Sequence, residues 1–377
     1  MLKNCASAFL CCAAIVGAAA AAHAGSYQSL YDFTALQDGR SPQSSLIDVN
    51  GVLYGTTFYG GENDLGTVFS FDPASGTETV LHQFNPDTDG SRLASGVVEY
   101  GGLLYGAATE GGVRRHGTAF SVNPTTNAFA VLYSFGGKAN GDAPGSLVQA
   151  GSKLYGTTSK GPGKSGYGTV FSLNPATGVT KTLHAFNGTD GADPSYGLVL
   201  VHGMLFGTTA SGGNGFGTVF SVNPKTGVES TLYAFKGVPD GASPNGGLID
   251  VGGTLYGTTY AGGPADAGTI FSIDPASDVE TAIYSFPTQG RGIGPSAGLV
   301  DASGKLYGTT RYGGKKGYGT IFSFDLAQGT EKEVYSFRGV GDGQHPVAAM
   351  VDVGGTLYGT TSEGGFIGGG TVFSYTP

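Results

Sequence analysis

The sequence has 377 residues, of which 70 are glycine and 12% are charged, and its formal net charge is −9. This acidic balance argues against a nucleic-acid partner, because phosphate binding relies on clustered Lys and Arg. It argues equally against adsorption to an anionic lipid surface. Abundant glycine, few charges and no tryptophan are typical of a β protein with many turns.

The first 24 residues predict a cleaved secretory signal. A positive start at Lys3 precedes an apolar, alanine-rich stretch over residues 6–22, and Ala22-His23-Ala24 gives the small-x-small pattern that a signal peptidase cuts. The stretch contains too much alanine and glycine for a membrane anchor, and no other segment predicts a membrane span. We therefore expect an exported protein, periplasmic or extracellular, that begins at Gly25.

The cysteines give a prediction about metals and cofactors. All three, Cys5, Cys11 and Cys12, lie within the predicted signal, so we expect no disulfide and no thiolate metal site in the mature chain. Residues 87–90 begin like a calcium loop but lack its later glutamate. The sequence predicts no metal site and no cofactor.

From residue 25 to residue 377 the chain repeats one unit of about fifty residues and predicts a single domain. Variants of Leu-Tyr-Gly-Thr-Thr occur seven times, at spacings of 50 or 51 residues. The aromatic residues of the seven copies are Tyr54, Tyr105, Tyr155, Phe206, Tyr256, Tyr307 and Tyr358. Such a period predicts a repeat architecture rather than a conventional globular core.

Each repeat predicts four short strands. In the first full copy these are residues 46–50, 52–57, 66–71 and 77–84, which are rich in β-branched and aromatic residues and separated by Gly, Asn or Asp-Pro turns. No sustained 3.6-residue apolar period occurs, so helices should be nearly absent. The turn from third to fourth strand predicts a positive φ at one position in six repeats, because the residue there is always Gly, Asn or Asp. These residues are Gly76, Asn127, Gly178, Gly227, Asp278 and Gly329.

The ends of the chain predict a closed ring. Seven third strands and seven fourth strands are present, yet the mature chain begins on a fourth strand (residues 29–33) and stops after a third (residues 370–375). Pairing these two strands would complete the last sheet. We therefore predict an all-β, seven-bladed β-propeller with four antiparallel strands per blade. An open solenoid would need polar capping repeats, which neither end supplies.

The repeated unit resembles the GloVer tandem repeat of exported bacterial proteins. The likeness rests on Gly-x-Leu-Tyr-Gly-Thr-Thr followed by Gly-Thr-Val/Ile-Phe-Ser, as in residues 253–259 with 268–272 and residues 355–361 with 370–374, and it spans residues 26–377. Those relatives are described as choice-of-anchor proteins, since members end in different surface-attachment tails. The resemblance implies export and a propeller-like fold but no particular activity. Only three residues follow Ser374, which implies a free rather than an anchored form.

The loops after the second and fourth strands should share one face of the propeller. They vary between repeats, and variable loops on a fixed frame are where binding residues concentrate, so we place the candidate site at the channel mouth on this face. Tyrosines beside the Gly-Gly loops can stack on sugars or pack between loops; basic clusters can attract an anionic polysaccharide or simply be solvated. The candidate binding residues are Tyr59, Arg114, Arg115, His116, Tyr260, Arg311, Tyr312 and Lys315.

Two further sets of polar residues predict structural roles. His82 and His184 occupy a fourth-strand position that is Tyr in the other five repeats, which predicts packed aromatic rings. An Asp recurs in Asp-Gly-x-x-Pro and its variants, and we predict that it forms turns rather than binds a cation. The recurring aspartates are Asp38, Asp89, Asp190, Asp240 and Asp342.

No catalytic set is evident. Residues 294–298 match the Gly-x-Ser-x-Gly nucleophile elbow, but no strand precedes the string and no helix follows it. The leading hypothesis is an exported, monomeric, non-catalytic propeller that binds a glycan or an envelope protein. The alternative is a polysaccharide-acting hydrolase or lyase with paired carboxylates at the channel mouth. A purely structural envelope component is a third possibility.

Overall fold

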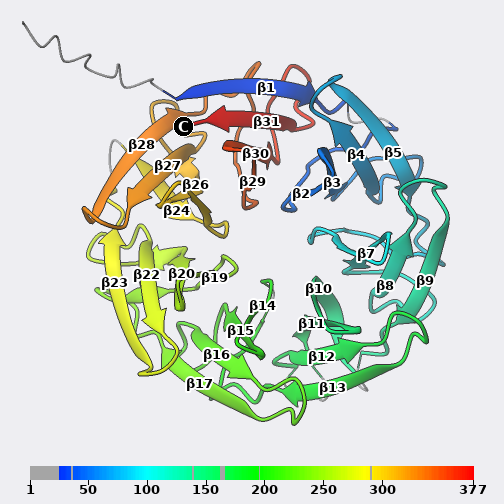
Figure 1. Cartoon of the computed structure of the whole chain (residues 1–377), viewed down its shortest axis with the longest axis horizontal. Helices are drawn as coiled ribbons and strands as arrows, with labels where there is room; N and C mark the ends of the chain where they lie inside the picture. The colour runs from blue at the N-terminus through cyan, green and yellow to red at the C-terminus, as the bar shows by residue number, and fades with distance from the viewer. Residues whose placement is uncertain (1–24, 35–36, 138–139, 162–165, 195, 289–290) are drawn as a thin grey trace, which may run out of the picture.

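Seven antiparallel sheets stand around a central axis in the computed structural model (Figure 1). The structure describes residues 25–377 except 35–36, 138–139, 162–165, 195 and 289–290. The predicted signal, residues 1–24, lies outside these described residues. Every regular element in the described part is a strand, so the prediction of an all-β, seven-bladed propeller is confirmed.

We number the blades from the one that contains both ends of the chain, and give their strands from the axis outward. Blade 2 contains β2 (Ile47–Val49), β3 (Val52–Thr57), β4 (Thr67–Asp72) and β5 (Thr77–Gln83). Blade 3 contains β6 (Val98–Tyr100), β7 (Leu103–Ala108), β8 (Thr118–Val122) and β9 (Phe129–Ser134). Blade 4 contains β10 (Asp142–Ala150), β11 (Lys153–Lys160), β12 (Thr169–Leu173) and β13 (Thr180–Ala185).

The remaining blades repeat this order. Blade 5 contains β14 (Val199–Val201), β15 (Met204–Thr209), β16 (Thr218–Val222) and β17 (Glu229–Ala234). Blade 6 contains β19 (Ile249–Val251), β20 (Thr254–Thr259), β22 (Thr269–Asp274) and β23 (Val279–Ser285). Blade 7 contains β25 (Val300–Ala302), β26 (Lys305–Gly313), β27 (Thr320–Asp325) and β28 (Thr330–Ser336), with the short β24 (Gly292–Pro295) also paired to β26.

Blade 1 closes the ring with strands from both ends of the chain. β29 (Val351–Val353), β30 (Thr356–Thr361) and β31 (Thr371–Thr376) run outward, and β1 (Ser26–Asp32) pairs antiparallel with β31 at the rim. Ser26 lies opposite Thr376 and Asp32 lies opposite Thr371. Figure 1 shows β1 and β31 side by side. The predicted closure is confirmed.

The Gly of each Leu-Tyr-Gly and the Phe of each Gly-Thr-Val-Phe-Ser form one packing unit. In blade 5, Gly207 lies opposite Phe220 on the adjacent strand, and Phe220 is fully buried. The Phe that follows the fourth strand of the preceding blade then meets this ring edge to face: Phe186 and Phe220 have ring centroids 5.0 Å apart at 71°. Because such pairs join neighbouring blades, these aromatic rings hold the ring of sheets together.

The two threonines of the motif make different hydrogen bonds. In blades 1, 2, 5 and 6 the first one reaches the next blade, as Thr258 Oγ1 donates to the Ala297 carbonyl at 3.0 Å. The equivalent Thr157 and Thr309 hydroxyls of blades 4 and 7 are buried without a partner among the described residues. The second threonine shares a hydrogen bond across its own blade, as between Thr259 and Thr269 at 2.8 Å. The repeated Thr-Thr therefore ties strands together both within and between blades.

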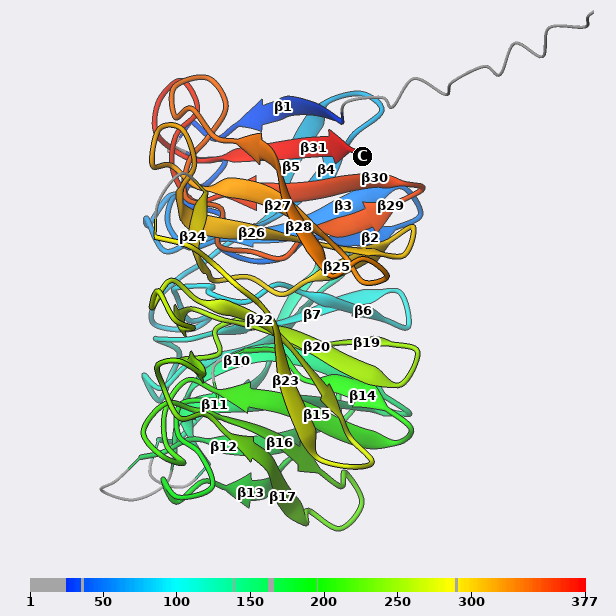
Figure 2. The ribbon, with the colours of Figure 1, turned by 90° about the vertical axis from the view of Figure 1, so that its left-hand side faces the viewer.

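The two faces of the disc differ (Figure 2). Hairpin turns after the first and third strands form one face, which we call the turn face; the loops after the second and fourth strands form the other, the loop face. The six predicted left-handed turn residues all have φ between 55° and 78°, which confirms that prediction. On the loop face, the segment that enters each blade pairs with that blade's own loop, as in β18 (Gly241–Ala242) with β21 (Ala261–Gly262).

Candidate functional site

A cavity of about 590 Å³ surrounds the axis of the propeller. Each blade lines it with the short segment that leads into the first strand, and these segments carry small side chains at one repeated position. That position, ten residues before the aromatic residue of Leu-Tyr-Gly, is occupied by Ser44, Ser95, Gly145, Gly246, Ala297 and Ala348 in six blades. In blade 5 it is occupied by Tyr196, so the cavity has one side chain that breaks the pattern.

Tyr196, Tyr260 and Arg311 are the large side chains at the loop-face end of this cavity. Tyr260 and Arg311 are equivalent residues of blades 6 and 7, each directly after Leu-Tyr-Gly-Thr-Thr. The Tyr260 ring packs on Gly294, where a Cβ would lie 2.9 Å from the ring. Gly294, at φ +62°, therefore makes room for the tyrosine.

Arg311 is the one charged residue among the described residues that line the cavity. Arg311 Nε and Ser296 Oγ are buried and have no hydrogen-bond partner in the structure. Among the described residues that line the cavity, none is Asp, Glu, His or Lys. Burial, with a smaller effect of Asp193, raises the pKa of Tyr196 to about 12, while Arg311 acts in the opposite direction. Tyr196 therefore keeps its hydroxyl proton, and the site offers donors to an anion.

The structure separates Tyr59 from this group. Its ring lies under two guanidinium groups, with Arg92 at 4.2 Å and Arg40 at 4.6 Å from the ring centroid. Arg40 in turn pairs with Asp64 at 2.8 Å. Tyr59 is therefore a packed element of the blade 2 loop and does not line the channel cavity.

The basic loop of blade 3 also lies apart from the cavity. Arg114 and Arg115 are exposed, and Arg115 has a positive φ of 60°. His116 Nδ1 lies 3.3 Å from Asp142 Oδ2, and its ring covers Gly137. None of the three is among the residues that line the channel cavity.

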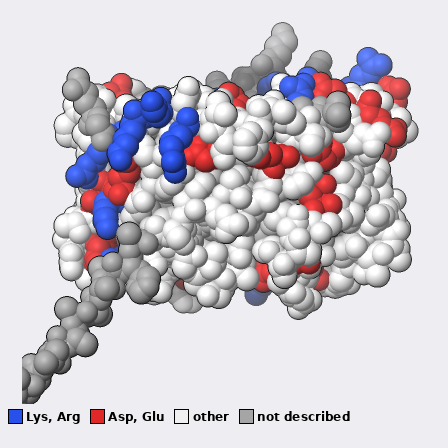
Figure 3. All heavy atoms as spheres, turned by 90° about the horizontal axis from the view of Figure 1, so that it is seen from above, with Lys and Arg blue, Asp and Glu red and all other residues white. Residues whose placement is uncertain are grey.

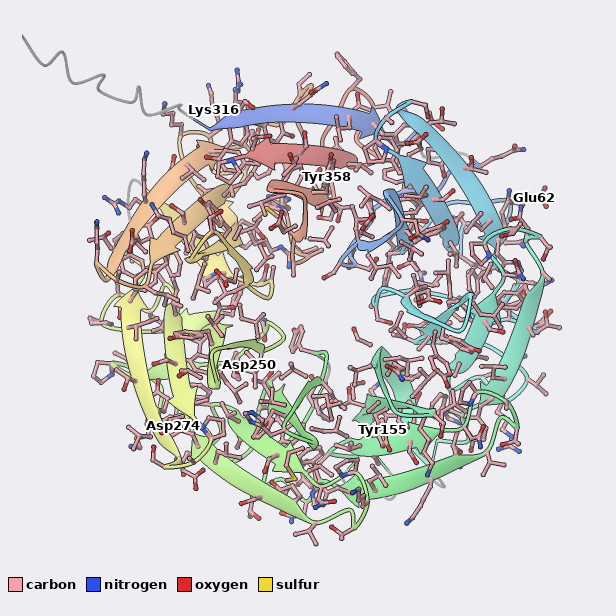
Figure 4. All side chains as sticks on the ribbon, viewed as in Figure 1. Glu62, Tyr155, Asp250, Asp274, Lys316 and Tyr358 are labelled. Carbon is pink, nitrogen blue, oxygen red and sulfur yellow. The ribbon has the colours of Figure 1, made fainter. Side chains whose placement is uncertain are left out.

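Tyr312 and Lys315 lie beside the cavity rather than in it. The Tyr312 ring has the Arg311 guanidinium 5.3 Å from its centroid and meets the His345 ring at 5.3 Å. The Lys315 amide donates to Ser336 Oγ at 2.7 Å, next to the outer strand β28. The next residue, Lys316, lies at the rim of blade 7 in Figure 4. Of the predicted residues, the structure brings only Tyr260 and Arg311 together in the channel mouth.

Sequence reasoning missed Tyr196 and Ser296. The signal for Tyr196 is its difference from the Ser, Gly or Ala at the same repeat position, which an internal alignment of the seven units reveals. In the sequence, Ser296 stands out only as the serine of the Gly-x-Ser-x-Gly string. In the structure, Ser296 belongs to the segment between β24 and β25 and lines the channel.

On the side of the molecule seen in Figure 3, Lys and Arg lie mainly toward the loop face. Figure 3 shows the rim of the propeller edge-on, with Lys and Arg gathered toward this face and most of the wall uncharged. Several basic side chains come from loop-face segments, namely Arg40, Arg92, Arg114 and Arg311. Lys153, Lys225 and Lys305, by contrast, lie in or beside turns of the turn face, so positive charge is present on both faces.

The recurring aspartates bond to their own turns and to the fourth strand. Asp342 accepts the backbone N–H groups of Arg338 and Gly339, each at 2.9 Å, and the Tyr335 hydroxyl at 2.6 Å. The equivalent pairs are Tyr31 with Asp38 (2.9 Å), His82 with Asp89 (3.0 Å), His184 with Asp190 (3.1 Å) and Tyr233 with Asp240 (2.9 Å). The two histidines are thus packed aromatics that also form a polar contact.

A glutamate from the next blade completes two of the Tyr–Asp clusters. Glu78 lies beside Tyr31 and Asp38, and Glu280 lies beside Tyr233 and Asp240. Burial, reinforced by the charge of the neighbouring aspartate, raises the pKa of each glutamate from 4.5 to about 7. The folded state therefore favours the protonated form of each carboxyl.

Replacing both glutamates with Gln is expected to flatten the pH dependence of stability. A raised carboxyl pKa favours the folded state below the unfolded value of 4.5, and this contribution is lost as pH rises to about 7. Solvent screening reduces the effect to about 1 kcal/mol per site at about pH 8. The melting temperature of Glu78→Gln/Glu280→Gln should thus rise relative to that of the native chain as the pH increases from 5 to 8. The exposed Glu62→Gln is the control, and parallel curves for all three proteins would contradict the expectation.

The fold and repeat define the class of protein as a β-propeller built from one tandem unit. The chain belongs to the Gloeobacter/Verrucomicrobia repeat family, which it matches over residues 18–165 and 145–373. No curated protein matches it. Among the described residues, no helix has the length and hydrophobicity needed to cross a membrane.

Several solved structures share the fold at low identity. The extracellular domain of the putative one-component system BT4673 from B. thetaiotaomicron is similar over 93% of this chain and 40% of that chain, at 9% identity and a TM-score of 0.62. This chain therefore spans about two fifths of that relative. An oligogalacturonate lyase from Vibrio parahaemolyticus matches over 93% of both chains, at 10% identity and a TM-score of 0.56. Another oligogalacturonate lyase, in complex with manganese, matches over 86% of both, at 12% identity and a TM-score of 0.53.

Proposed function

We propose that this protein is an exported, non-catalytic binding protein that holds a carboxylate-bearing glycan at the loop-face mouth of its channel. The observation that carries the proposal is Arg311, whose guanidinium lines the channel cavity with a buried, unpartnered Nε. No ion pair joins it to any described residue. A guanidinium presents its donors in a planar fork that matches a carboxylate.

The neighbours of Arg311 suit a sugar acid. Ser296 Oγ is buried without a partner, and the Tyr196 hydroxyl stays protonated, so both can donate to sugar oxygens. Tyr260 adds an aromatic ring beside the cavity, and aromatic faces are large apolar surfaces at low conformational cost. Small side chains around the rest of the ring leave space for the ligand.

The enzymatic alternative has less support from these residues. A glycosidase needs two carboxyl groups beside the scissile bond, and a lyase needs a base within reach of the substrate. The described residues of the cavity include no carboxylate, and the pKa of about 12 for Tyr196 makes it a poor base at neutral pH. We therefore favour binding over turnover.

Calorimetric titration with galacturonate oligosaccharides tests the proposal, since two of the similar structures are oligogalacturonate lyases. The matched ligand is the same oligosaccharide with its carboxyl groups reduced to alcohols. We expect the native chain to prefer the acid, and Arg311→Gln to bind it about 30-fold more weakly, or about 2 kcal/mol. Arg114→Gln removes an equal charge from an exposed loop and should bind normally.

Three results would count against this function. Equal binding of acidic and reduced sugars, or no effect of Arg311→Gln, would remove the role of the arginine. Release of unsaturated product, followed by its ultraviolet absorbance, would favour a lyase. If no uronate binds and an envelope protein is captured in an Arg311-dependent way, the ligand is a protein carboxylate instead.

A further inference from the structure

The outer boundary between blades 4 and 5 brings together an imidazole and two carboxylates. His184 comes from β13, Asp190 from the segment that links the blades, and Glu229 from β17. One ligand atom from each lies within 4.8 Å of the other two. His184 Nε2 and Asp190 Oδ2 are 3.1 Å apart, and these two side chains are only 19% and 13% exposed.

This combination occurs at one blade boundary among the described residues. The position of His184 is Tyr in five blades, and the position of Glu229 is Glu in three others, where it meets a Tyr. His82 is the other histidine at this position, but there Phe129 replaces the glutamate and stacks on the imidazole at 3.6 Å. The pair of His82 and Asp89 is thus the counterpart of the His184–Asp190 pair at another blade boundary. It has no third metal-ligating residue beside it within the part of the chain that the structure describes.

Hydrogen bonds orient both carboxylates. Asp190 Oδ1 accepts the backbone N–H of Asn187 at 2.9 Å, and Asp190 Oδ2 accepts the side-chain amide of Asn187 at 2.8 Å. Glu229 Oε1 accepts the Thr231 hydroxyl at 3.0 Å. Neither carboxylate pairs with a Lys or Arg of the described part of the chain. The half-buried cluster therefore concentrates negative charge around one imidazole, an arrangement that a divalent cation would neutralise.

We propose that His184, Asp190 and Glu229 bind a divalent ion of the Zn²⁺ class, which ties blade 4 to blade 5. Ligand atoms of a tetrahedral zinc site, at bond lengths near 2.1 Å, are ~3.4 Å apart. The His184–Asp190 separation of 3.1 Å is close to this spacing, so a small change of either side chain makes room for the ion. Rotation of the Glu229 side chain supplies the third ligand, and water completes the shell.

The site escaped sequence reasoning because its ligands follow no local spacing. His184 and Asp190 are close in the chain, but Glu229 is in the next repeat and reaches them only through the packing of β17 beside β13. The sequence alone predicts no metal site. The relevant signal is that His replaces Tyr in a repeat whose successor carries Glu.

Titration of the untagged, chelator-treated chain with ZnCl₂ tests the proposal by calorimetry and thermal unfolding. We expect one bound equivalent and a rise in melting temperature, since an ion that binds the folded state stabilises it. His184→Tyr installs the residue of five other blades, and Glu229→Phe copies the His82 cluster. Each should fold and bind zinc more than about 100-fold more weakly, because the loss of even an outer-shell partner costs about 10–100-fold.

His82→Tyr is the matched control and should bind zinc like the native chain. The converse variant, Phe129→Glu, should gain a second equivalent at His82 and Asp89. The Phe129→Glu variant still tests the proposal if His184→Tyr or Glu229→Phe folds poorly. Absence of zinc binding by the native chain, or unchanged affinity in both His184→Tyr and Glu229→Phe, would overturn the proposal.

Discussion

Deletion of residues 25–34 is expected to produce a chain that unfolds at a much lower temperature and aggregates. The deletion removes β1 and leaves β31 as an unpaired edge, which is a template for association. It also removes the fully buried Phe33, whose ring meets Phe69 of blade 2 at 5.2 Å. Loss of one such phenylalanine costs about 3–5 kcal/mol.

The same deletion opens the other side of blade 1. Tyr27 stacks on Tyr335 of blade 7, with ring centroids 3.9 Å apart, and its hydroxyl donates to the Asp342 carbonyl. Both boundaries of blade 1 thus depend on one short strand. Because a folded domain is stable by only about 5–15 kcal/mol in total, we expect little folded ring to survive.

A circular permutant is the control for this experiment. Residues 25–34 are moved behind Pro377 through a short glycine-containing turn, so that blade 1 acquires the connectivity of the other blades. Circular dichroism melting and size-exclusion chromatography should then give the behaviour of the intact chain. If the truncated chain melts like the intact one, β1 does not hold the ring closed.

The closure of the ring could be predicted by counting the third and fourth strands in the sequence. Ser29 lies opposite Phe373, as expected from a chain that lacks one turn between a third and a fourth strand. The left-handed turns followed equally directly, because Gly, Asn and Asp are the residues that tolerate a positive φ. Repetition makes such inferences strong, since each one is tested in every copy of the unit.

The residues that line the channel cavity were harder to predict, because a one-residue offset reverses the direction of a side chain on an extended segment. Tyr59 and Tyr260 both lie near a Gly-Gly pair, but Tyr59 is equivalent to Ala261, one position further along. Tyr260 and Arg311 share the register that lines the channel. Alignment by repeat position, rather than by distance to the glycines, would have separated them.

Contacts between blades were the hardest to foresee. Tyr196 lines the same cavity as Arg311 because the ring of blades brings together residues more than a hundred positions apart in the sequence. The polar clusters at the rim likewise join a fourth strand to the next one, as Tyr284 Oη donates to Glu331 at 2.9 Å. Such pairs depend on the angle between sheets, which one repeat does not encode.

Gly207→Ala is expected to destabilise the protein by about 1–3 kcal/mol, the usual cost of overpacking a core. A Cβ on Gly207 would lie 2.7 Å from Phe220 Cζ and 2.8 Å from Leu198 Cδ2. Phe220 is fully buried and cannot move away without disturbing its contact with Phe186. Glycine is thus required in Leu-Tyr-Gly because a side chain there would occupy the space of the phenylalanine ring.

Urea unfolding of a double-mutant cycle separates this cause from a general effect of alanine. Phe220→Leu shortens the side chain above Gly207, so Gly207→Ala should cost less in that background, with a coupling of about 1 kcal/mol. Gly247→Ala is the control, because its Cβ would meet nothing closer than 3.8 Å, and it should change stability by less than about 0.5 kcal/mol. Additive effects of Gly207→Ala and Phe220→Leu would show that the glycine is needed for another reason. Coupling would instead explain why the two motifs recur together, since each Phe can enter the core only where a neighbouring strand has no side chain.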